Sequence, residues 1–269
     1  MSVAIRKETF RVPYPTKDRQ VDLAVEERGE GGASFLLLHG GAGPGSMARF
    51  AASLAEQKNA RVLTPTHPGF AMTQRPEDLN SVRALAKFYA AFLSQLQAED
   101  VTVIGNSMGG WLGAELAILN PPGIRRAVLV GALGIEVQGH QIPDTSKLTL
   151  DEIMNLSYHN PGPFRVDPSS LTDVQRAAFA SNRSALQAYA SKSTDPTLLG
   201  RLAGISIPVL VVSGESDRIA DAEYGRAYAA AIPKARFELL MGTGHLPQIE
   251  TPELLLQTVW KFTQATQDG

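Results

Sequence analysis

Short apolar runs alternate along the chain with longer segments of helical pattern. After a polar opening, residues 8–12 and 21–26 have strand character, and the turn-like PTKDRQ between them predicts an antiparallel hairpin. Further β-rich runs lie at residues 35–38, 61–63, 101–104, 127–130, 209–212 and 237–240. Continuous apolar runs are typical of strands buried on both faces, which need helices on both sides of the sheet. The pattern therefore predicts an α/β fold with a mostly parallel, doubly wound sheet of about eight strands.

The segments between these runs predict the covering helices, at residues 46–57, 81–96, 108–119, 221–231 and 252–264. One interval breaks the alternation, because roughly seventy residues after position 130 contain no comparable β run. Helical patterns within it, at 148–156, 172–190 and 197–203, are separated by the proline-rich NPGPFRVDPSS. We expect residues 134–200 to form an inserted helical cap on a core made of residues 1–133 and 201–269.

Composition narrows the function classes. The chain has 269 residues, of which 43% are hydrophobic and 19% charged, as is usual for a globular protein. A net charge of −2 gives no electrostatic basis for binding nucleic acid or an anionic membrane. We expect a small neutral or weakly charged molecule as the partner, with the choice between monomer and homodimer left open.

The absence of cysteine excludes a disulfide framework, a thiolate metal site and a cysteine nucleophile. Any nucleophilic work falls to serine, and no metal or cofactor is expected. The N-terminus MSVAIRKETFRVPYP lacks the apolar core of a signal peptide, and no run of about 18 apolar residues predicts a membrane span. A cytoplasmic enzyme is expected.

A nucleophile elbow is predicted where Gly105-Asn106-Ser107-Met108-Gly109 joins an apolar β run to an amphipathic helix. A turn sharp enough to expose a serine leaves no room for Cβ atoms two residues before and after it. The alternative is a glycine-rich dinucleotide-binding turn, but the G-x-G-x-x-G pattern is missing. Ser107 is therefore the candidate nucleophile.

A serine hydroxyl needs a base, and chain position selects the candidate histidine and its acidic partner. His245 follows the last β run and precedes the last helix, so it lies on a loop where open parallel sheets bind their ligands. Asp217 follows the neighbouring strand and can orient the imidazole, with Glu215 as the second choice. The other interpretations are a loop histidine and a helix N-cap aspartate. The order Ser107, Asp217, His245 is that of a hydrolase triad.

An oxyanion hole would complete this site. One donor is expected from the amide of Met108, and the other from the glycine-rich loop of residues 38–45, with Gly41 as the leading candidate. A phosphate-cradling loop is the alternative, but the Gly-Lys-Ser/Thr ending of a P-loop is missing.

The motifs HGGAGPG, GNSMGG, GESD and GTGH, in that order, resemble the serine-nucleophile branch of the α/β-hydrolase fold superfamily. Within it, GPG and the pair Asn106-Ser107 are similar to the meta-cleavage product hydrolases, which cleave C–C bonds in vinylogous 1,5-diketones. The resemblance implies that Arg183 matches the arginine that such enzymes use on their substrate.

Substrate choice is expected to depend on the cap and on the residues beside the triad. The apolar residues of the cap have a competing explanation, which is that they pack the cap onto the core and do not contact a substrate. The candidate substrate-binding residues are Asn106, Arg183, Leu246, Met154, Tyr158 and Phe179, with Leu156, Phe164, Leu186 and Tyr189 as further pocket candidates. Trp111 and His67 are expected to be structural.

Three functions remain open at this point. The first is hydrolysis of a small carboxylic ester through an acyl-enzyme. The second keeps the triad but cleaves the C–C bond of a meta-fission product. The third is a non-catalytic small-molecule receptor on the same fold, because a fold alone does not determine function.

Overall fold

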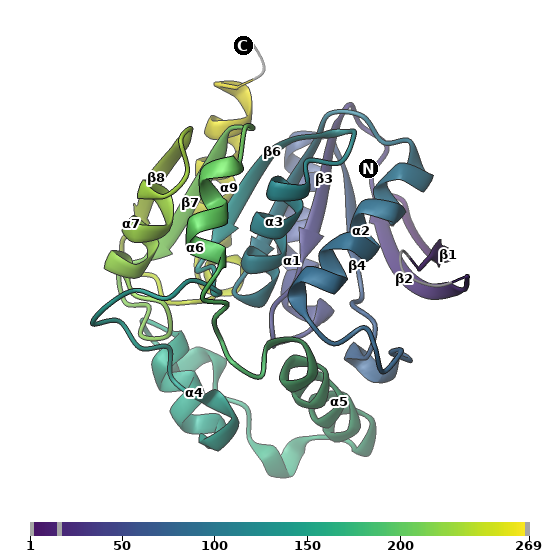
Figure 1. Ribbon diagram of the computed structural model, residues 1–269. Coiled ribbons are helices and arrows are strands. Elements are labelled where there is room, and N and C mark those ends of the chain that lie inside the picture. The colour runs from purple at the N-terminus through teal and green to yellow at the C-terminus, as the bar shows by residue number, and fades with distance from the viewer. Residues whose placement is uncertain (1–2, 15–17, 267–269) are drawn as a thin grey trace.

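A computed structural model describes residues 3–14 and 18–266 (Figure 1). Within these residues, eight strands form one sheet in the order β1-β2-β4-β3-β5-β6-β7-β8. The strands are β1 (Ile5–Pro13), β2 (Gln20–Arg28), β3 (Ala33–Leu38), β4 (Ala60–Pro65), β5 (Val101–Asn106), β6 (Ile124–Val130), β7 (Val209–Gly214) and β8 (Ala235–Leu240). From β4 to β8 every pairing is parallel, whereas β1 and β2 add an antiparallel edge. The predicted mostly parallel sheet is confirmed.

Helices connect the strands. They are α1 (Ala48–Lys58), α2 (Val82–Leu96), α3 (Met108–Leu119), α4 (Leu150–Ser157), α5 (Asp173–Ala190), α6 (Leu198–Arg201), α7 (Ala222–Ala230), α8 (Pro247–Glu250) and α9 (Pro252–Gln264). Short 3-10 helices are η1 (Pro44–Met47), η2 (Phe70–Met72), η3 (Thr145–Lys147), η4 (Gly162–Phe164), η5 (Pro168–Ser170) and η6 (Leu202–Gly204). None of the helices in the described residues is long and apolar enough to cross a membrane.

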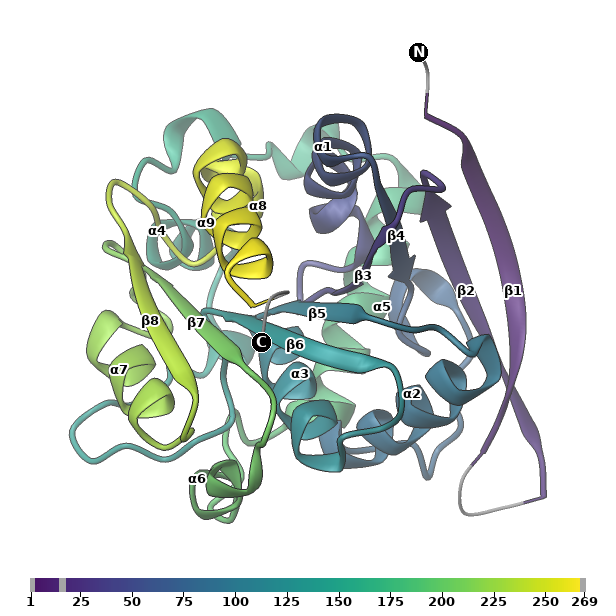
Figure 2. The same cartoon turned by 90° about the horizontal axis from the view of Figure 1, so that it is seen from above.

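Two apolar layers separate the sheet from its helices (Figure 2). One face is covered by α1 and α9, which contribute Phe50 and Val259. The other is covered by α2, α3 and α7, which contribute Phe88, Leu112 and Tyr228. Burial of large apolar side chains on both faces explains why the strand segments read as continuous apolar runs.

Some predicted boundaries shift by a few residues for local reasons. The helix expected at 46–57 is α1, preceded by η1, in which Pro44 occupies the first turn. The helix expected at 197–203 is α6 followed directly by η6. The turn predicted at residues 15–20 falls partly on residues 15–17, which lie outside the described residues. The ends of the predicted core, at 1–2 and 267–269, lie outside them too.

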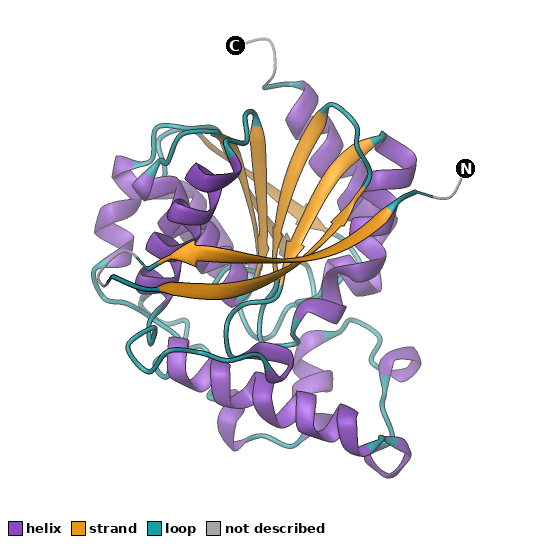
Figure 3. Cartoon of the chain, turned by 90° about the vertical axis from the view of Figure 1, so that its right-hand side faces the viewer, coloured by secondary structure: helices purple, strands orange, loops and turns teal. Residues whose placement is uncertain are grey.

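The segment 134–200, which we call the cap segment, carries α4 and α5 beyond the ends of the strands (Figures 1 and 3). Both helices begin with a capping box, in which Thr149 pairs with Glu152 and Thr172 pairs with Gln175. These local signals determine where the two helices start, although most side chains in their first turns are exposed to solvent. The division of the chain at 134 and 200 stays a prediction, and α6 packs next to the core helix α3 (Figure 1).

A buried ion pair ties the return from the cap segment to α3. Arg201 donates to both carboxylate oxygens of Glu115, at 2.6 and 2.7 Å, and to Asp195 at 2.8 Å. The Glu115 side chain is 2% exposed. Since Asp195 N–H also donates to Gly134 O at 2.7 Å, this ion pair holds both ends of the cap segment together.

Replacement of Arg201 by Met should lower the free energy of unfolding by about 2–4 kcal/mol, because Glu115 would remain buried without a cation. The matched control is Arg49→Met, which removes an exposed pair with Glu253 and should cost under about 1 kcal/mol. Urea denaturation of both variants measures the difference. Equal losses would show that the Glu115 pair contributes no more than a surface pair.

Candidate active site

Ser107 links β5 to α3 in a strained backbone conformation. Its φ is 58° and its ψ is −120°, a region that costs on the order of 1–3 kcal/mol for a residue with a side chain. Hydrogen bonds hold it there, because Ser107 N–H donates to Val130 O at 2.9 Å and Leu133 N–H donates to Ser107 O at 3.3 Å. The last residue of β6 and the loop that follows it therefore fix the half-buried serine at the end of β5.

The glycines on either side of Ser107 are required by close backbone approaches. A Cβ on Gly105 would lie 1.9 Å from Gly109 O, and one on Gly109 would lie 2.0 Å from Leu38 O. Both neighbours are backbone atoms that cannot rotate away. The strand-to-helix turn is therefore tight enough to exclude any side chain at these two positions.

His245 and Asp217 form a buried pair. The two atoms His245 Nδ1 and Asp217 Oδ2 are 2.8 Å apart, and each residue is 4% exposed. The other Asp217 oxygen accepts the N–H groups of Ile219 at 2.8 Å and Ala220 at 2.9 Å. A carboxylate only accepts hydrogen bonds, so in the neutral ring the proton lies on Nδ1 and Nε2 has the free lone pair. This tautomer can act as a base.

Two alternatives to Asp217 as the partner of His245 were considered, namely that Asp217 is a helix N-cap and that Glu215 is the acid. The N-cap of α7 is Asp221, whose side chain accepts Tyr224 N–H at 2.8 Å, so Asp217 is not the helix cap. Glu215 is exposed and accepts Gly242 N–H at 2.9 Å across the turn. Among the two predicted acids, only Asp217 contacts the His245 ring.

Backbone contacts place the His245 ring beside Ser107. Gly131, which follows the carbonyl that binds Ser107, is so close to the ring that a Cβ on it would lie 2.9 Å from His245 Nδ1. Asn106, which precedes Ser107, donates its side-chain amide to His245 O at 2.9 Å and to Val130 O at 3.2 Å. Within the described residues, Ser107 Oγ makes no hydrogen bond to the His245 ring. A hydrogen bond between a nucleophile and its base commonly becomes short only when the substrate is bound.

Asn106 was predicted to contact substrate, but the structure places its side chain inside the protein. It is 2% exposed, both of its N–H groups donate to carbonyls, and its Oδ1 accepts Gln248 Nε2–H at 3.1 Å. The amide therefore connects the serine turn to the histidine loop and has no N–H left for a ligand. The sequence analysis missed Gln248, because no fixed spacing along the chain relates a glutamine to the asparagine side chain that it binds in the folded protein.

The cap segment also holds the histidine loop. His245 N–H donates to Ser157 O at 2.6 Å, at the end of α4. The carboxylate of Glu250 accepts three backbone N–H groups. One comes from Gly244 in the histidine loop, at 2.7 Å, and the other two come from His159 and Asn160 in the cap segment, at 3.1 and 2.9 Å. His245 is thus anchored to the cap segment on one side and to Asn106 on the other.

The expected oxyanion donors lie around Ser107. Met108 is the first residue of α3, so its N–H has no partner within the helix and lies at the positive end of the helix dipole. Gly40 packs against the serine, because a Cβ on it would lie 2.8 Å from Ser107 Cβ. Gly41 faces the cap, where a Cβ would lie 2.8 Å from Leu186 of α5. The glycine-rich loop therefore contacts the serine through Gly40 and the helix α5 through Gly41.

The remaining predicted substrate-binding residues are divided between the interior and the surface. Met154 and Tyr158 are 9% and 4% exposed, and Tyr158 stacks on Phe164 with ring centroids 4.6 Å apart. Burial, with a smaller contribution from the charge of Glu250, raises the pKa of Tyr158 to about 12. Leu246 is half-buried, whereas Phe179 and Arg183 are exposed on α5 and Arg183 donates to Ser146 O of η3.

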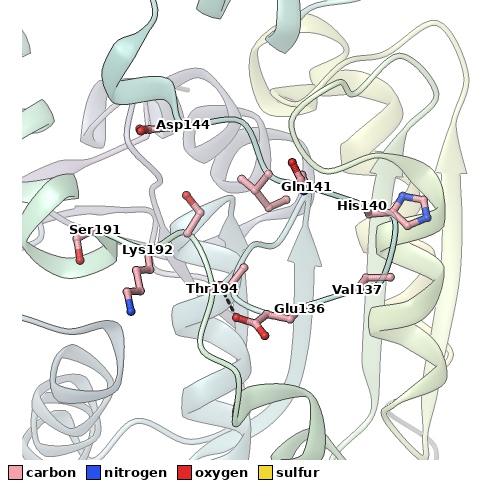
Figure 4. Close-up of a pocket in the computed structure, with 10 residues that line it drawn as sticks. Glu136, Val137, His140, Gln141, Asp144, Ser191, Lys192 and Thr194 are labelled. Carbon is pink, nitrogen blue, oxygen red and sulfur yellow. Dashed lines mark hydrogen bonds between the residues drawn. The ribbon is translucent and has the colours of Figure 1, made fainter.

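A polar cavity of about 470 Å³ lies elsewhere, between the segment that follows β6 and the residues after α5 (Figure 4). Its wall includes Glu136, His140 and Lys192, and Thr194 Oγ1 donates to Glu136 at 3.1 Å across it. The lining residues include neither Ser107 nor His245 nor Asp217. This cavity is therefore distinct from the serine site.

Two further histidines, His39 and His67, are fully buried near the glycine-rich loop, and their ring centroids are 3.9 Å apart. Burial lowers the pKa of His39 to about 4, against a smaller opposing effect of its hydrogen bond to Gly40. Burial, with a contribution from His39, lowers the pKa of His67 well below its usual value. Both rings are therefore neutral at pH 7, which agrees with the structural role expected for His67.

Comparison with known proteins gives a family match over most of the chain. Residues 35–258 match the family described as "Alpha/beta hydrolase family". The 2-hydroxy-6-oxo-2,4-heptadienoate hydrolase of Pseudomonas putida is 28% identical over 262 residues, which cover 87% of this chain and 90% of the relative. A 2-hydroxymuconate semialdehyde hydrolase of Pseudomonas putida is 27% identical, with 88% and 89% covered.

Among solved structures, a thermophilic esterase from Thermogutta terrifontis superimposes with a TM-score of 0.77. The two proteins are 20% identical, and the match covers 96% of this chain and 99% of the esterase. At this level of identity the likeness shows the shared fold alone.

The buried neutral histidines should make stability depend on pH. Their pKa values are lower in the folded protein than in the unfolded chain, so the contribution of each neutral ring to stability is present above about pH 6.5 and is lost as the pH falls. For His39, with a folded pKa of about 4, the loss between pH 7 and 4.5 should be about 2 kcal/mol, and the wild type should lose more stability over this range than His67→Gln. Urea denaturation of the wild type and His67→Gln at both pH values measures this, since the carboxylates contribute equally to both proteins. Identical pH slopes would contradict the neutral state of His67.

Proposed function

The chain belongs to the alpha/beta hydrolase family, and from this premise we propose that it is a serine hydrolase with Ser107 as the nucleophile. In this proposal His245 is the general base and Asp217 orients it. The observation that carries the proposal is the buried 2.8 Å contact between His245 and Asp217 next to a serine in a strained turn. A small molecule is the expected partner.

We propose a small carboxylic ester as the substrate. Ser107 Oγ bonds to the carbonyl carbon while its proton moves to His245 Nε2, and the amides of Met108 and Gly41 stabilise the resulting oxyanion. The carbon–oxygen bond to the alcohol then breaks as His245 returns the proton to the leaving oxygen. Water repeats the sequence on the acyl-enzyme and releases the acid, while Asp217 accepts the hydrogen bond of Nδ1–H and stabilises the imidazolium.

Cleavage of a C–C bond in a meta-fission product is the second candidate, and the names of the two Pseudomonas relatives favour it. The leaving group would then be a carbon, so its electron pair must be delocalised onto a conjugated carbonyl before it takes a proton. Such substrates carry a carboxylate, which a guanidinium can bind. Arg183 is the candidate for this contact because it is exposed on α5, three residues from Leu186, which lies over Gly41.

Replacement of Ser107 by Ala should lower the hydrolysis rate of any good substrate by at least about 10³-fold, since the members of a triad act as a unit. The control is Ser94→Ala, which removes an exposed hydroxyl on α2 and should leave the rate unchanged. A screen of p-nitrophenyl esters, lactones and a dienol meta-fission product measures both. Equal turnover by wild type and Ser107→Ala would remove Ser107 from the mechanism.

A fluorophosphonate probe separates the enzyme from a non-catalytic receptor. We expect labelling of the wild type that is absent in Ser107→Ala. Labelling of Ser107 without turnover of any substrate in the screen would favour a receptor.

Replacement of Arg183 by Ala decides between the two substrate classes. If the natural substrate carries a carboxylate, kcat/KM for the dienol product should fall about tenfold or more, while that for a neutral aryl ester stays the same. The control is Arg176→Ala, an exposed arginine on the same helix that pairs with Asp173. If the dienol is consumed no faster than aryl esters and Arg183→Ala has no effect, the hypothesis of C–C bond cleavage is wrong.

A further inference from the structure

A chain of hydrogen bonds runs through the core from α2 to the glycine-rich loop. The Tyr89 hydroxyl lies 2.6 Å from His67 Nδ1, and His67 Nε2 lies 3.0 Å from His39 O. The backbone N–H of His67 donates to His39 Nε2 at 3.1 Å, and His39 Nδ1 lies 2.9 Å from Gly40 O. Tyr89 and both histidines are 0% exposed, so no water competes for these groups.

Only one arrangement of protons satisfies this chain when both rings are neutral. His39 Nε2 accepts a backbone N–H, so the ring proton is on Nδ1 and is donated to Gly40 O. His67 Nε2 faces a carbonyl, which only accepts, so it carries the proton of that ring. His67 Nδ1 must then accept the Tyr89 hydroxyl proton. Every ring nitrogen is satisfied and neither ring can change tautomer alone.

The carbonyl at the end of this chain belongs to the peptide that joins Gly40 to Gly41. In a planar trans peptide the C=O and the following N–H point in opposite directions. Holding Gly40 O therefore also sets the direction of the Gly41 N–H. Two glycines in succession have no side chains to restrict this peptide, so its orientation depends on such contacts. Gly43 N–H, which also donates to Gly40 O at 3.1 Å, supports the same orientation.

We propose that Tyr89, His67 and His39 are positioning residues that hold the Gly41 N–H in the direction of the developing oxyanion on the substrate. This inference rests on the proposed function, in which Gly41 is an oxyanion donor beside Ser107. The three side chains never touch the substrate in this arrangement. Tyr89 and His67 act through His39, which donates to the carbonyl of Gly40. Gly40 is also the residue that packs against the serine, since a Cβ on it would lie 2.8 Å from Ser107 Cβ.

Removal of the Tyr89 hydroxyl tests the proposal. With a short-chain p-nitrophenyl ester, Tyr89→Phe should lower kcat about tenfold or more and leave KM within about twofold, because a misdirected donor weakens the transition state more than the bound substrate. Phenylboronic acid, which forms a tetrahedral adduct with an active serine, should bind more weakly by a similar factor. The matched control is Tyr224→Phe, another buried tyrosine, whose hydroxyl donates to Ile135 O at 2.8 Å.

Tyr224→Phe should keep its kcat within about twofold of the wild type. If Tyr89→Phe has the same kcat and boronate affinity as Tyr224→Phe, the proposal is overturned, while loss of activity in Ser107→Ala still supports the serine hydrolase. If Tyr89→Phe does not fold by circular dichroism, His39→Leu removes the donor to Gly40 directly and must show the same loss of kcat. A folded His39→Leu variant with wild-type kcat would equally overturn it.

Discussion

Ser107 is held at a positive φ by hydrogen bonds from the end of β6 and the loop after it, because Val130 O accepts its N–H and Leu133 N–H donates to its carbonyl. The same loop continues into Gly131, which packs against the His245 ring, so one stretch of backbone sets the positions of both groups. The strain of the serine turn is therefore offset by hydrogen bonds that also define the site. The pairing of β5 with β6 therefore positions the serine turn and the His245 ring together.

The polar groups around the serine are arranged so that few of them can reorient. His245 is held through Asp217 on its ring, Asn106 on its carbonyl and Ser157 on its N–H. Each contact comes from a different part of the chain, which is an arrangement that a single loop could not provide. A preorganised site of this kind needs little rearrangement as charge develops during reaction.

Sequence patterns predicted the elements and the serine turn because these depend on local chemistry. The need for Gly105 follows from sterics within five residues, because a Cβ there would meet Gly109 O, whereas Gly109 faces Leu38 O of a neighbouring strand. The helix α9 was predicted at its observed bounds, residues 252–264. The ranking of Asp217 before Glu215 rested on the expected direction of the side chains and not on spacing alone, since the two residues lie in one turn. The structure has Asp217 at the His245 ring and Glu215 at Gly242 N–H. The roles of Asn106 and Glu250 were missed because their partners are backbone groups distant in sequence, which no residue pattern records.

Glu250 and Ser157 have a consequence for how such proteins can be recombined. Their bonds join the α4 end of the cap segment to the loop that carries His245, so the cap segment helps to hold His245. A cap segment transplanted from a relative would break these bonds unless its own backbone reproduced them. The stretch from Ser157 to Asn160 is therefore best kept with the core, and a crossover placed after it would leave the support of His245 intact.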